Sequence, residues 1–493
     1  MLLRVQNSRT ELYHTDPFIL HVLDQELRYP TPTAHLLASG IELPDGVMQG
    51  WDGWVRLLHQ PKNSSAWVAS GLLDRVCYFS RKFGYEVRVE DLRTRPVGDV
   101  PDPVKIPLRD YQLEAVVLAV ERGLGVLDLP PRAGKTRVMC EITRRLALPT
   151  IWIAPTDRIV QQTQEVLEGF FGQHYSVHLI GSAGWLEASR KRVVLATAAT
   201  AANLPTAFYG SRKVIVVDEF HHSASASYRK IFGHCDHIYH RYGMTGTYFR
   251  SAGDDLAMHA IISGTIYKAT SADMLRRGWL VPVKAIFIPV DAGKIPAKSA
   301  NFFAEHGKRG IHENGLRNQW AAYAAHALLS RGRKPLILVG TKAQGKIIRE
   351  LLLRSLPQSP DRAEFQAAEF ISTDIDRLRQ GRILKSFAEG AEVKILIGTS
   401  ILGEGVDLPT VDALVYAKGE KAEVSLTQAI YRICTAIEGK REAVLIDFAD
   451  RHHRKLLAHA LERLRIYHAE PIFQVEVMRD ARSFVSWVEG LAN

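Results

Sequence analysis

The amino-acid sequence predicts an α/β protein in which two doubly wound parallel-sheet domains follow a small α+β domain. From about residue 106 onward, short and almost wholly apolar segments alternate with amphipathic ones, as expected for parallel strands that helices cover on both faces. The alternation runs through two successive series, which meet near residues 275–283. The first hundred residues follow neither series, and they predict the small domain.

Four local patterns make up the small domain. Leu2–Val5 is compatible with a strand, and Trp51–Leu58 with a turn followed by a strand. In Gly71–Phe83 the apolar residues recur at helical spacing, and Gly84 follows as a helix stop. Tyr85–Val89 then alternates like a strand. These few short elements predict a compact α+β unit.

The two large domains are predicted from their apolar strands. The expected strands of the first series are Val126–Leu129, Thr150–Ala154, Val193–Thr197 and Val214–Val217. The expected strands of the second series are Ala285–Val290, Pro335–Val339, Val393–Gly398, Ala413–Ala417 and Ala443–Phe448. A helix is expected over Arg317–Leu329. A basic helix is expected over His452–Arg465, with one apolar stripe formed by Leu456, Leu457, Leu461 and Leu464.

A segment rich in Pro and Asp at 95–105 predicts a linker. We therefore expect the small domain at 1–98, the first large domain at 99–278, the second at 279–470 and a C-terminal tail at 471–493.

The amino-acid composition limits the classes of protein to which the chain can belong. The chain has 493 residues, a formal net charge of +10 and 46% hydrophobic residues, which excludes a disordered protein. Residues 1–98 contain 11 Lys+Arg and 11 Asp+Glu, so the surplus lies on the rest of the chain. Such a surplus is compatible both with polyanion binding and with a simple solubility function.

Cysteine spacing and the chain start indicate the compartment. The four cysteines lie far apart, which argues against a disulfide framework and against a zinc site. Met1–Thr10 lacks the pattern of a signal peptide, and no apolar run reaches the roughly 18–20 residues that cross a bilayer. We expect a soluble cytoplasmic protein without a membrane partner.

A phosphate-binding loop is predicted between an apolar strand and a helix. A strand–loop–helix presents backbone N–H groups and a helix N-terminus to phosphates. Lys135 would reach the β- and γ-phosphates of ATP, and the Thr136 hydroxyl would hold Mg²⁺. Only the Gly-Lys-Thr half of the full signature is present, so an ordinary loop is the alternative. The expected nucleotide-binding loop comprises Leu129, Pro130, Pro131, Arg132, Ala133, Gly134, Lys135 and Thr136.

Two carboxylates follow the apolar strand Val214–Val217. Beside a phosphate-binding loop, Asp218 would hold the Mg²⁺ shell, and Glu219 would orient and deprotonate the attacking water. Acidic residues also end strands for no catalytic reason, but the two motifs together predict nucleotide hydrolysis. Nearby histidines do not predict a metal site and are expected in a solvated loop: His221, His222, His234, His237 and His240.

The order of these motifs resembles the superfamily-2 helicases of the DExH type, whose two motor domains are RecA-like. Through this resemblance, Arg109 and Gln112 are the expected adenine contacts. The segment from Asp218 to His221 fits DExH. The expected nucleic-acid contacts of the first motor domain are Pro155, Thr156, Arg158 and Thr197, and the residues expected to couple hydrolysis to strand movement are His221, Thr245, Gly246 and Thr247.

The resemblance extends through the second series. It implies further nucleic-acid contacts at Thr341 and Thr399, nucleotide contacts at Gly405 and Asp407, and a coupling function for Gln428. Arg432 is the implied arginine finger for the γ-phosphate. Two positions of this last motif depart from its usual form: Tyr431 replaces Gly and Thr435 replaces the second Arg.

Within the superfamily, the chain resembles phage UvsW-type helicases and the related XPB-like repair helicases. The segment from Gly50 to Gly53 and the following strand and helix are similar to the N-terminal domain of the UvsW type. Trp51 and Trp54 there suit base stacking or core packing. The resemblance implies an ATP- and Mg²⁺-dependent DNA helicase or translocase acting on forks and Holliday-type junctions in replication, recombination or repair. A monomer is favoured, in the host cytoplasm if the protein is phage-encoded.

Three other functions remain open. The motor motifs do not separate DNA from RNA, so an RNA helicase of the same superfamily is one alternative. A nucleic-acid clamp that binds ATP but hydrolyses it weakly is another, suggested by Thr435. A restriction motor subunit is the third, although the sequence offers no convincing nuclease cluster of carboxylates and lysine.

Overall fold

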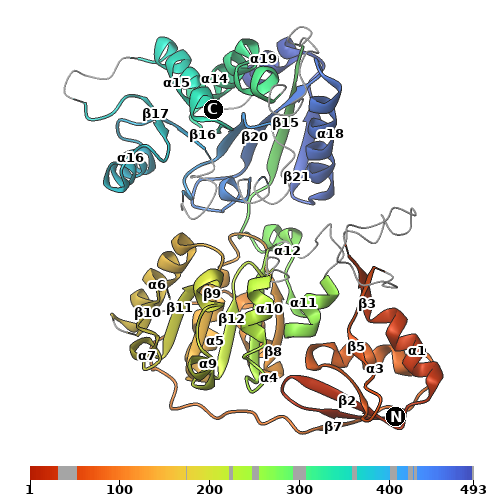
Figure 1. Cartoon of the computed structure of the whole chain (residues 1–493). Coiled ribbons are helices and arrows are strands. Elements are labelled where there is room, and N and C mark those ends of the chain that lie inside the picture. The colour runs from red at the N-terminus through yellow and green to blue at the C-terminus, as the bar shows by residue number, and fades with distance from the viewer. Residues whose placement is uncertain are drawn as a thin grey trace, which may run out of the picture. The chain divides into compact units, whose positions relative to one another are not determined.

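The computed structural model describes residues 1–31, 53–173, 175–181, 183–220, 226–246, 255–291, 307–357, 363–399, 408–419, 426 and 430–490 (Figure 1). The chain divides into two compact units, Met1–Ala269 and Thr270–Asn493. Among the described residues, no helix combines the length and apolar character needed to cross a bilayer.

A five-stranded sheet of order β5-β6-β2-β1-β7 opens the first unit. Its strands are β1 (Leu2–Val5), β2 (Arg9–Tyr13), β5 (Leu58–His59), β6 (Ala66–Ala69) and β7 (Arg88–Asp91). The other elements are α1 (Pro17–Glu26), the pair β3 (Arg28–Pro30) and β4 (Trp54–Arg56), the short 3₁₀ helix η1 (Ser70–Leu72) and α3 (Leu73–Lys82). The expected helix and strand of this region are thus present, with the strand at 85–89 moved to β7. Gly84 ends α3 with a φ of 86°, which glycine adopts without strain.

The N-terminal sheet is joined to the rest of the first unit through its own core. Leu256 and Ala260 of α11 (Asp255–Ile262) are buried in the same cluster as Leu3 and Val68 of the N-terminal sheet. Arg241, which is only 5% exposed, donates from Nη2 to the Asn7 carbonyl and to Ser70 Oγ, both at 2.6 Å. The small domain and the adjoining sheet domain therefore share buried contacts.

Gly71 lies where two backbones meet, and we expect Gly71→Ala to destabilise this joint. A Cβ atom at this position would lie 2.1 Å from the His259 carbonyl oxygen and 2.7 Å from that of Ala260. Backbone atoms cannot rotate away, so the free energy of unfolding should fall by about 1–3 kcal/mol, the range for overpacking. Thermal unfolding of the full-length variant measures this loss.

Gly169→Ala is the matched control, because no atom lies within 4 Å of the position that the alanine Cβ would take, and Ala favours the helix there. An unchanged melting temperature for Gly71→Ala would show that the two backbones can separate without loss of stability.

The larger sheet of the first unit is seven-stranded, parallel throughout, and of order β10-β11-β9-β12-β13-β8-β14. Its strands are β8 (Leu124–Asp128), β9 (Thr150–Ala154), β10 (Ser176–His178), β11 (Val193–Thr197), β12 (Val214–Val217), β13 (His240–Thr245) and β14 (Thr265–Lys268). Its helices include α4 (Asp110–Arg122), α5 (Lys135–Leu146), α6 (Asp157–Phe171), α7 (Trp185–Ala188), α8 (Ala198–Ala201), α9 (Thr206–Gly210) and α10 (Ala226–Phe232). The central strands are buried along their whole length, as the apolar runs predict.

Residues 92–109, all within the described part, form no helix or strand between β7 and α4. The segment is nevertheless held against the first sheet domain. Arg144 Nη1 donates to the Asp102 carbonyl at 2.7 Å, and Arg192 Nη2 lies 3.0 Å from Asp99 Oδ2. In Figure 1 this orange segment runs from β7 to α4.

The second unit contains another seven-stranded parallel sheet, of order β17-β18-β16-β19-β20-β15-β21. Its strands are β15 (Val283–Val290), β16 (Pro335–Leu338), β17 (Ala368–Ile371), β18 (Ile395–Gly398), β19 (Ala413–Tyr416), β20 (Ala443–Asp450) and β21 (Phe473–Val477). Its helices include α12 (Ser271–Arg276), a π-helix (Lys308–His312), α14 (Gly315–Ser330), α15 (Lys342–Ser355), α16 (Arg377–Glu389), α18 (Arg454–Ala469) and α19 (Ala481–Glu489). The fold class is therefore the predicted one, with two tandem RecA-like domains.

Two segments at the C-terminal end differ from expectation. Residues 471–493, expected to be a tail, contain β21, which pairs with β15, and α19, whose Phe484 is fully buried. The buried side of α18 is formed by Leu456, Ala460, Arg463 and Tyr467, whereas Leu461 of the expected stripe is 49% exposed. The sequence pattern misplaced this face because Arg463 is buried through its ion pair with Asp447 at 2.8 Å.

Candidate active site

The predicted phosphate-binding loop connects the buried strand β8 to helix α5, which begins at Lys135. Gly134 has a φ of 75°, and a Cβ atom on it would lie 2.3 Å from Gln112 Nε2. Only glycine fits this position. Val138, Ile142 and Leu146 bury the inner face of α5, as expected, so the N-terminus of the helix is fixed beside the loop.

The segment assigned to adenine recognition also shapes the loop. The Ala133 carbonyl accepts hydrogen bonds from Tyr111 Oη and from Gln112 Nε2, both at 2.7 Å. Gln112 Oε1 in turn accepts from the Arg109 backbone N–H at 2.9 Å. Tyr111 is fully buried and was not among the expected site residues. The sequence signal that could have identified Tyr111 is its position between Arg109 and Gln112 in the same motif.

The two carboxylates after β12 lie next to the loop lysine. Asp218 is buried, and its Oδ1 accepts from the Glu219 N–H at 2.9 Å. Glu219 Oε1 lies 4.0 Å from Lys135 Nζ. Glu219 has a φ of 47°, which is strained for a residue other than glycine and is common at functional sites.

Burial and, to a smaller extent, the Glu219 charge raise the pKa of Asp218 to about 6, and the Lys135 charge opposes this rise. A bound cation would stabilise the ionised form of this carboxyl group and so oppose the rise in its pKa. Oxygen donors of this kind suit a hard divalent ion such as Mg²⁺. The buried Asp218 carboxylate therefore fits the metal that the sequence predicts at Thr136 and Asp218.

The end of β13 closes the site from the neighbouring strand. The Leu129 N–H donates to the Thr245 carbonyl at 3.0 Å. A Cβ atom on Gly246 would lie 2.9 Å from Lys135 Nζ and 3.0 Å from Pro131 Cδ. Thr245 and Gly246 thus lie against the phosphate-binding loop, as a coupling motif would require.

Two further residues near the site were not expected from any motif. Tyr228 of α10 is 2% exposed, and its pKa is raised by burial and by the charges of Asp218 and Glu219. Lys268 Nζ, at the end of β14, lies 3.2 Å from Asp128 Oδ2. The chain fold brings both residues to the carboxyl edge of the sheet, and local sequence gives no signal for either.

The predicted phosphate-gripping threonines begin helices at the carboxyl ends of parallel strands. The hydroxyl oxygens of Thr156, Thr197 and Thr341 accept from the backbone N–H groups two or three residues into α6, α8 and α15, at 3.4, 3.2 and 3.2 Å. Capping fixes the orientation of these side chains. Pro155 precedes and Arg158 follows the first of them, and the partly buried Thr399 follows β18.

The last motif of the second unit is packed into its domain. Arg432 is 6% exposed, between the buried residues Tyr431 and Ile433. Burial and the nearby Glu470 charge raise the pKa of Tyr431. Its hydroxyl lies near both Glu470 and Ser271. Thr435 forms an antiparallel β-bridge with Leu280, and its Oγ1 is buried. Both departures from the usual motif are therefore structural residues of this domain.

Some expected site residues lie outside the described part of the chain. They are His221, Thr247, Gly405, Asp407 and Gln428, together with Trp51 and His222.

The remaining histidines correct one expectation. His240 is in β13, fully buried, with Nδ1 3.1 Å from Tyr242 Oη, and is not in a solvated loop. His234 Nδ1 lies 3.0 Å from Thr206 Oγ1, and His237 Nε2 lies 3.0 Å from the Tyr209 carbonyl oxygen. Within the described residues, no three His, Cys, Asp or Glu side chains are grouped as metal ligands would be.

We expect His240 to make stability fall in mild acid. Burial lowers the pKa of His240 to about 4, so in the folded state it stays neutral at pH values where the unfolded chain takes up a proton. Its contribution is therefore present above about pH 6.5 and is lost as the pH falls toward 4, by on the order of 2–3 kcal/mol. His240→Asn, which keeps a donor for Tyr242, should lack this loss.

Urea unfolding at several pH values measures the difference. If wild type and His240→Asn lose stability in parallel between pH 7 and 4, titration of His240 does not contribute.

Two family models match the chain in the order of its two sheet domains. Residues 105–250 match the family described as type III restriction enzyme, res subunit, and residues 321–435 match the helicase conserved C-terminal domain. The first match contains Lys135, Asp218 and Glu219, and the second contains Arg432.

Curated relatives cover most of the chain. The DNA 3'-5' translocase XPB2 of Sulfurisphaera tokodaii is 24% identical over 74% of this chain and 87% of its own length. The ATP-dependent DNA helicase uvsW of Enterobacteria phage T4 is 20% identical over 85% of this chain and 88% of its own length.

Among solved structures, the ATP-dependent Type ISP restriction-modification enzyme LlaBIII bound to DNA is similar in fold. It has a TM-score of 0.57 and 16% identity over 84% of this chain and 36% of that one. From the two family matches, the relatives and the nucleotide-site geometry, the chain is an ATP-hydrolysing helicase that resembles the superfamily-2 members UvsW and XPB.

Proposed function

We propose that this helicase is an ATP-dependent DNA translocase that remodels or unwinds branched DNA. The observation that carries the motor assignment is that Glu219 and Gly246 both lie close to Lys135 at the N-terminus of α5. The DNA assignment rests on two relatives named as a DNA translocase and a DNA helicase, each of which is matched over at least 87% of its own length.

The chemistry follows from the positions of the side chains. The α5 N-terminus and Lys135 would bind the phosphates of ATP, and Thr136 and Asp218 would hold Mg²⁺, which when bound would neutralise charge on the phosphates. Glu219 orients a water molecule and accepts its proton as the oxygen attacks the γ-phosphorus. The bond between the γ-phosphorus and the bridging oxygen breaks, and ADP and phosphate are released. Arg432 of the second RecA-like domain is assigned to the charge that develops on the γ-phosphate.

Movement along DNA would use threonines near the ends of the parallel strands. Thr156, Thr197, Thr341 and Thr399 lie at carboxyl ends of strands in the two domains, where phosphates meet backbone N–H groups. Contacts of this kind carry little base information and depend strongly on salt. Arg109 is assigned to the adenine ring.

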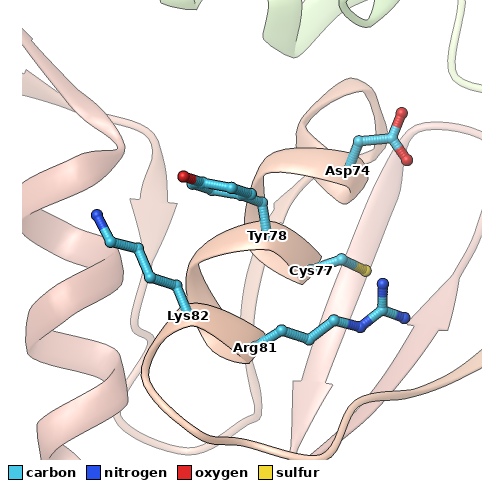
Figure 2. Close-up of a pocket in the computed structure, with 5 residues that line it drawn as sticks. All are labelled: Asp74, Cys77, Tyr78, Arg81 and Lys82. Atoms are coloured by element: carbon cyan, nitrogen blue, oxygen red, sulfur yellow. The ribbon is translucent and has the colours of Figure 1, made fainter.

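The N-terminal domain offers a surface for the branch. Along the exposed side of α3, Tyr78 is 60% exposed and borders a hollow of about 550 Å³ together with Arg81 and Lys82 (Figure 2). Figure 2 shows Tyr78 and Lys82 on one side of the helix, and Cys77 and Arg81 on the other. Aromatic and cationic side chains in alternation suit nucleic acid. We assign this surface to duplex or junction contacts.

The decisive experiment compares substrates. ATP hydrolysis and strand separation are measured with single-stranded DNA, forked DNA, four-way junctions and RNA, at one fixed salt concentration. We expect the strongest stimulation and the fastest strand separation with forks and junctions. Stronger stimulation of hydrolysis by RNA than by DNA would show that RNA is the substrate. Equal rates on linear and branched DNA would contradict the proposed preference for branched DNA.

A weakly hydrolysing clamp is the second candidate function. It is favoured by Thr435, whose backbone is bridged to Leu280 at the position where a second arginine is usual. In that case ATP would change affinity for DNA, while turnover would stay near its basal rate with every polymer in the comparison.

A further inference from the structure

A cavity of about 540 Å³ lies between the N-terminal sheet and the first RecA-like domain, within the first unit. One wall belongs to strands β2, β5 and β6 and to the turn before β2. The other belongs to the end of α10, the start of β13 and α11. The volume is within the range of small-ligand sites, and it is well away from the carboxyl edge of the sheet that holds Lys135.

Two aromatic rings form one wall of this cavity. His59 and Trp67 are cross-strand partners on β5 and β6, with ring centroids 3.9 Å apart and planes inclined by 14°. They lie on the outer face of the sheet, because their neighbours Leu58 and Val68 are buried on the inner face. A stacked pair at the rim of a cavity offers a flat surface to a further planar ring.

Polar groups line both walls of the cavity. Arg241 borders the cavity and uses Nη2 to bind the N-terminal domain, whereas its buried Nε–H donates to no described residue. Gln6 and Ser8, in the turn before β2, supply an amide and a hydroxyl that both donate and accept. These groups match the mixed donors and acceptors on the edge of a heterocycle.

The charges that line the cavity suit a neutral heterocyclic ring whose attached anionic backbone stays outside. Arg9 lies at the rim, paired with Glu11 at 2.8 Å, and the exposed Asp236 faces the same space. The cavity thus has one carboxylate and two guanidinium groups along its lining. A free nucleoside triphosphate would need more positive charge than this, but a base whose backbone stays outside would not.

We propose that this cavity binds a single unpaired nucleobase, stacked on the His59–Trp67 pair with its polar edge toward Gln6, Ser8 and Arg241. The inference rests on the proposed DNA function and deepens it. Branch points supply unpaired bases, and base stacking on aromatic side chains is tolerant of sequence. The site would hold the displaced base at the joint between the N-terminal domain and the motor.

The test uses the full-length protein and forked DNA with 2-aminopurine at the first unpaired position. Stacking on Trp67 quenches this base, so the wild-type complex should be dimmer than the Trp67→Leu complex. Trp67→Leu should also bind the fork about five-fold more weakly, the lower end of the stacking contribution per base. Trp67→Phe, which keeps an aromatic face, should recover most of the affinity.

Trp54→Leu is the matched control, since Trp54 is also in the N-terminal domain but lies outside the cavity, and the Arg28 guanidinium over its ring at 4.6 Å favours packing over base stacking for this residue. It should leave both the quenching and the affinity unchanged. Equal 2-aminopurine brightness in the wild-type and Trp67→Leu complexes would overturn the proposal, as would an equal effect of Trp54→Leu. ATP hydrolysis by the wild-type protein in the presence of DNA separates failure of the base site from failure of the proposed DNA function. If DNA stimulates hydrolysis but 2-aminopurine is not quenched, only the base site is wrong. If DNA does not stimulate hydrolysis, the proposed DNA function is wrong.

Discussion

Lys135→Ala is expected to reduce ATP hydrolysis by about 10²–10³-fold, the usual effect of removing one group that stabilises charge in the transition state. Lys135 Nζ lies 4.0 Å from Glu219 Oε1, and the lysine side chain is 14% exposed. Its removal also leaves the buried Asp218 beside Glu219 without the opposing charge that limits its pKa. Single-turnover hydrolysis with labelled ATP measures the loss.

Lys230→Ala is the control for this variant, because Lys230 is in the same unit but contacts only the Asn203 amide oxygen in the described structure, at 3.4 Å. Its turnover should equal that of wild type. If Lys135→Ala hydrolyses ATP normally, the loop between β8 and α5 is not the phosphate site, and the motor assignment is wrong. Melting curves of both variants separate loss of chemistry from loss of fold.

Arg432→Ala is expected to lower the turnover number by about 10³-fold or more while leaving ATP affinity nearly unchanged, as for an arginine finger. The reason is that a finger acts on charge that develops only in the transition state. Arg432 is 6% exposed in its own domain, so Arg432→Lys is measured beside it to keep a positive charge at the site. Pre-steady-state hydrolysis and binding of a fluorescent ATP analogue separate the two parameters.

Arg479→Ala is the matched control, because Arg479 is an exposed arginine of the same unit that the arginine-finger hypothesis does not need. Thr435→Arg is not expected to restore a second finger. The backbone of residue 435 is bridged to Leu280, and the Thr435 side-chain oxygen is buried. An arginine side chain at this position would therefore have to displace neighbouring residues of the same domain. Undiminished turnover of Arg432→Ala would transfer the finger function to another residue.

The parts of the fold that the sequence predicted best are the central strands. Thr150–Ala154, Val193–Thr197 and Val214–Val217 are found with their predicted bounds as β9, β11 and β12, because strands buried on both faces are apolar at every position. β13 was missed, since His240 and Arg241 make it look like a polar loop. Their burial depends on contacts with Tyr242 and with Asn7, and the latter is distant in sequence.

The site was predictable to the same extent. Motif spacing predicted that Lys135, Asp218 and Glu219 belong to one site, and the structure places them side by side. Tyr228 was not predictable, since its position beside the two carboxylates depends on the path of the chain through α10. The buried Arg463 shows the same limit: only its tertiary partner Asp447, at 2.8 Å, explains why it is on the inner side of α18.

Strand β13 has Arg241 near one end and is followed at the other by Gly246. Arg241 donates hydrogen bonds to Asn7 and Ser70 of the N-terminal domain, and Gly246 lies against Lys135. An extended strand advances about 3.3 Å per residue and resists stretching, since its hydrogen bonds to β8 and β12 run along its length. A mechanical load on the N-terminal domain would therefore be transmitted along this strand to Lys135, and the rate of ATP turnover should depend on the resistance that the small domain meets.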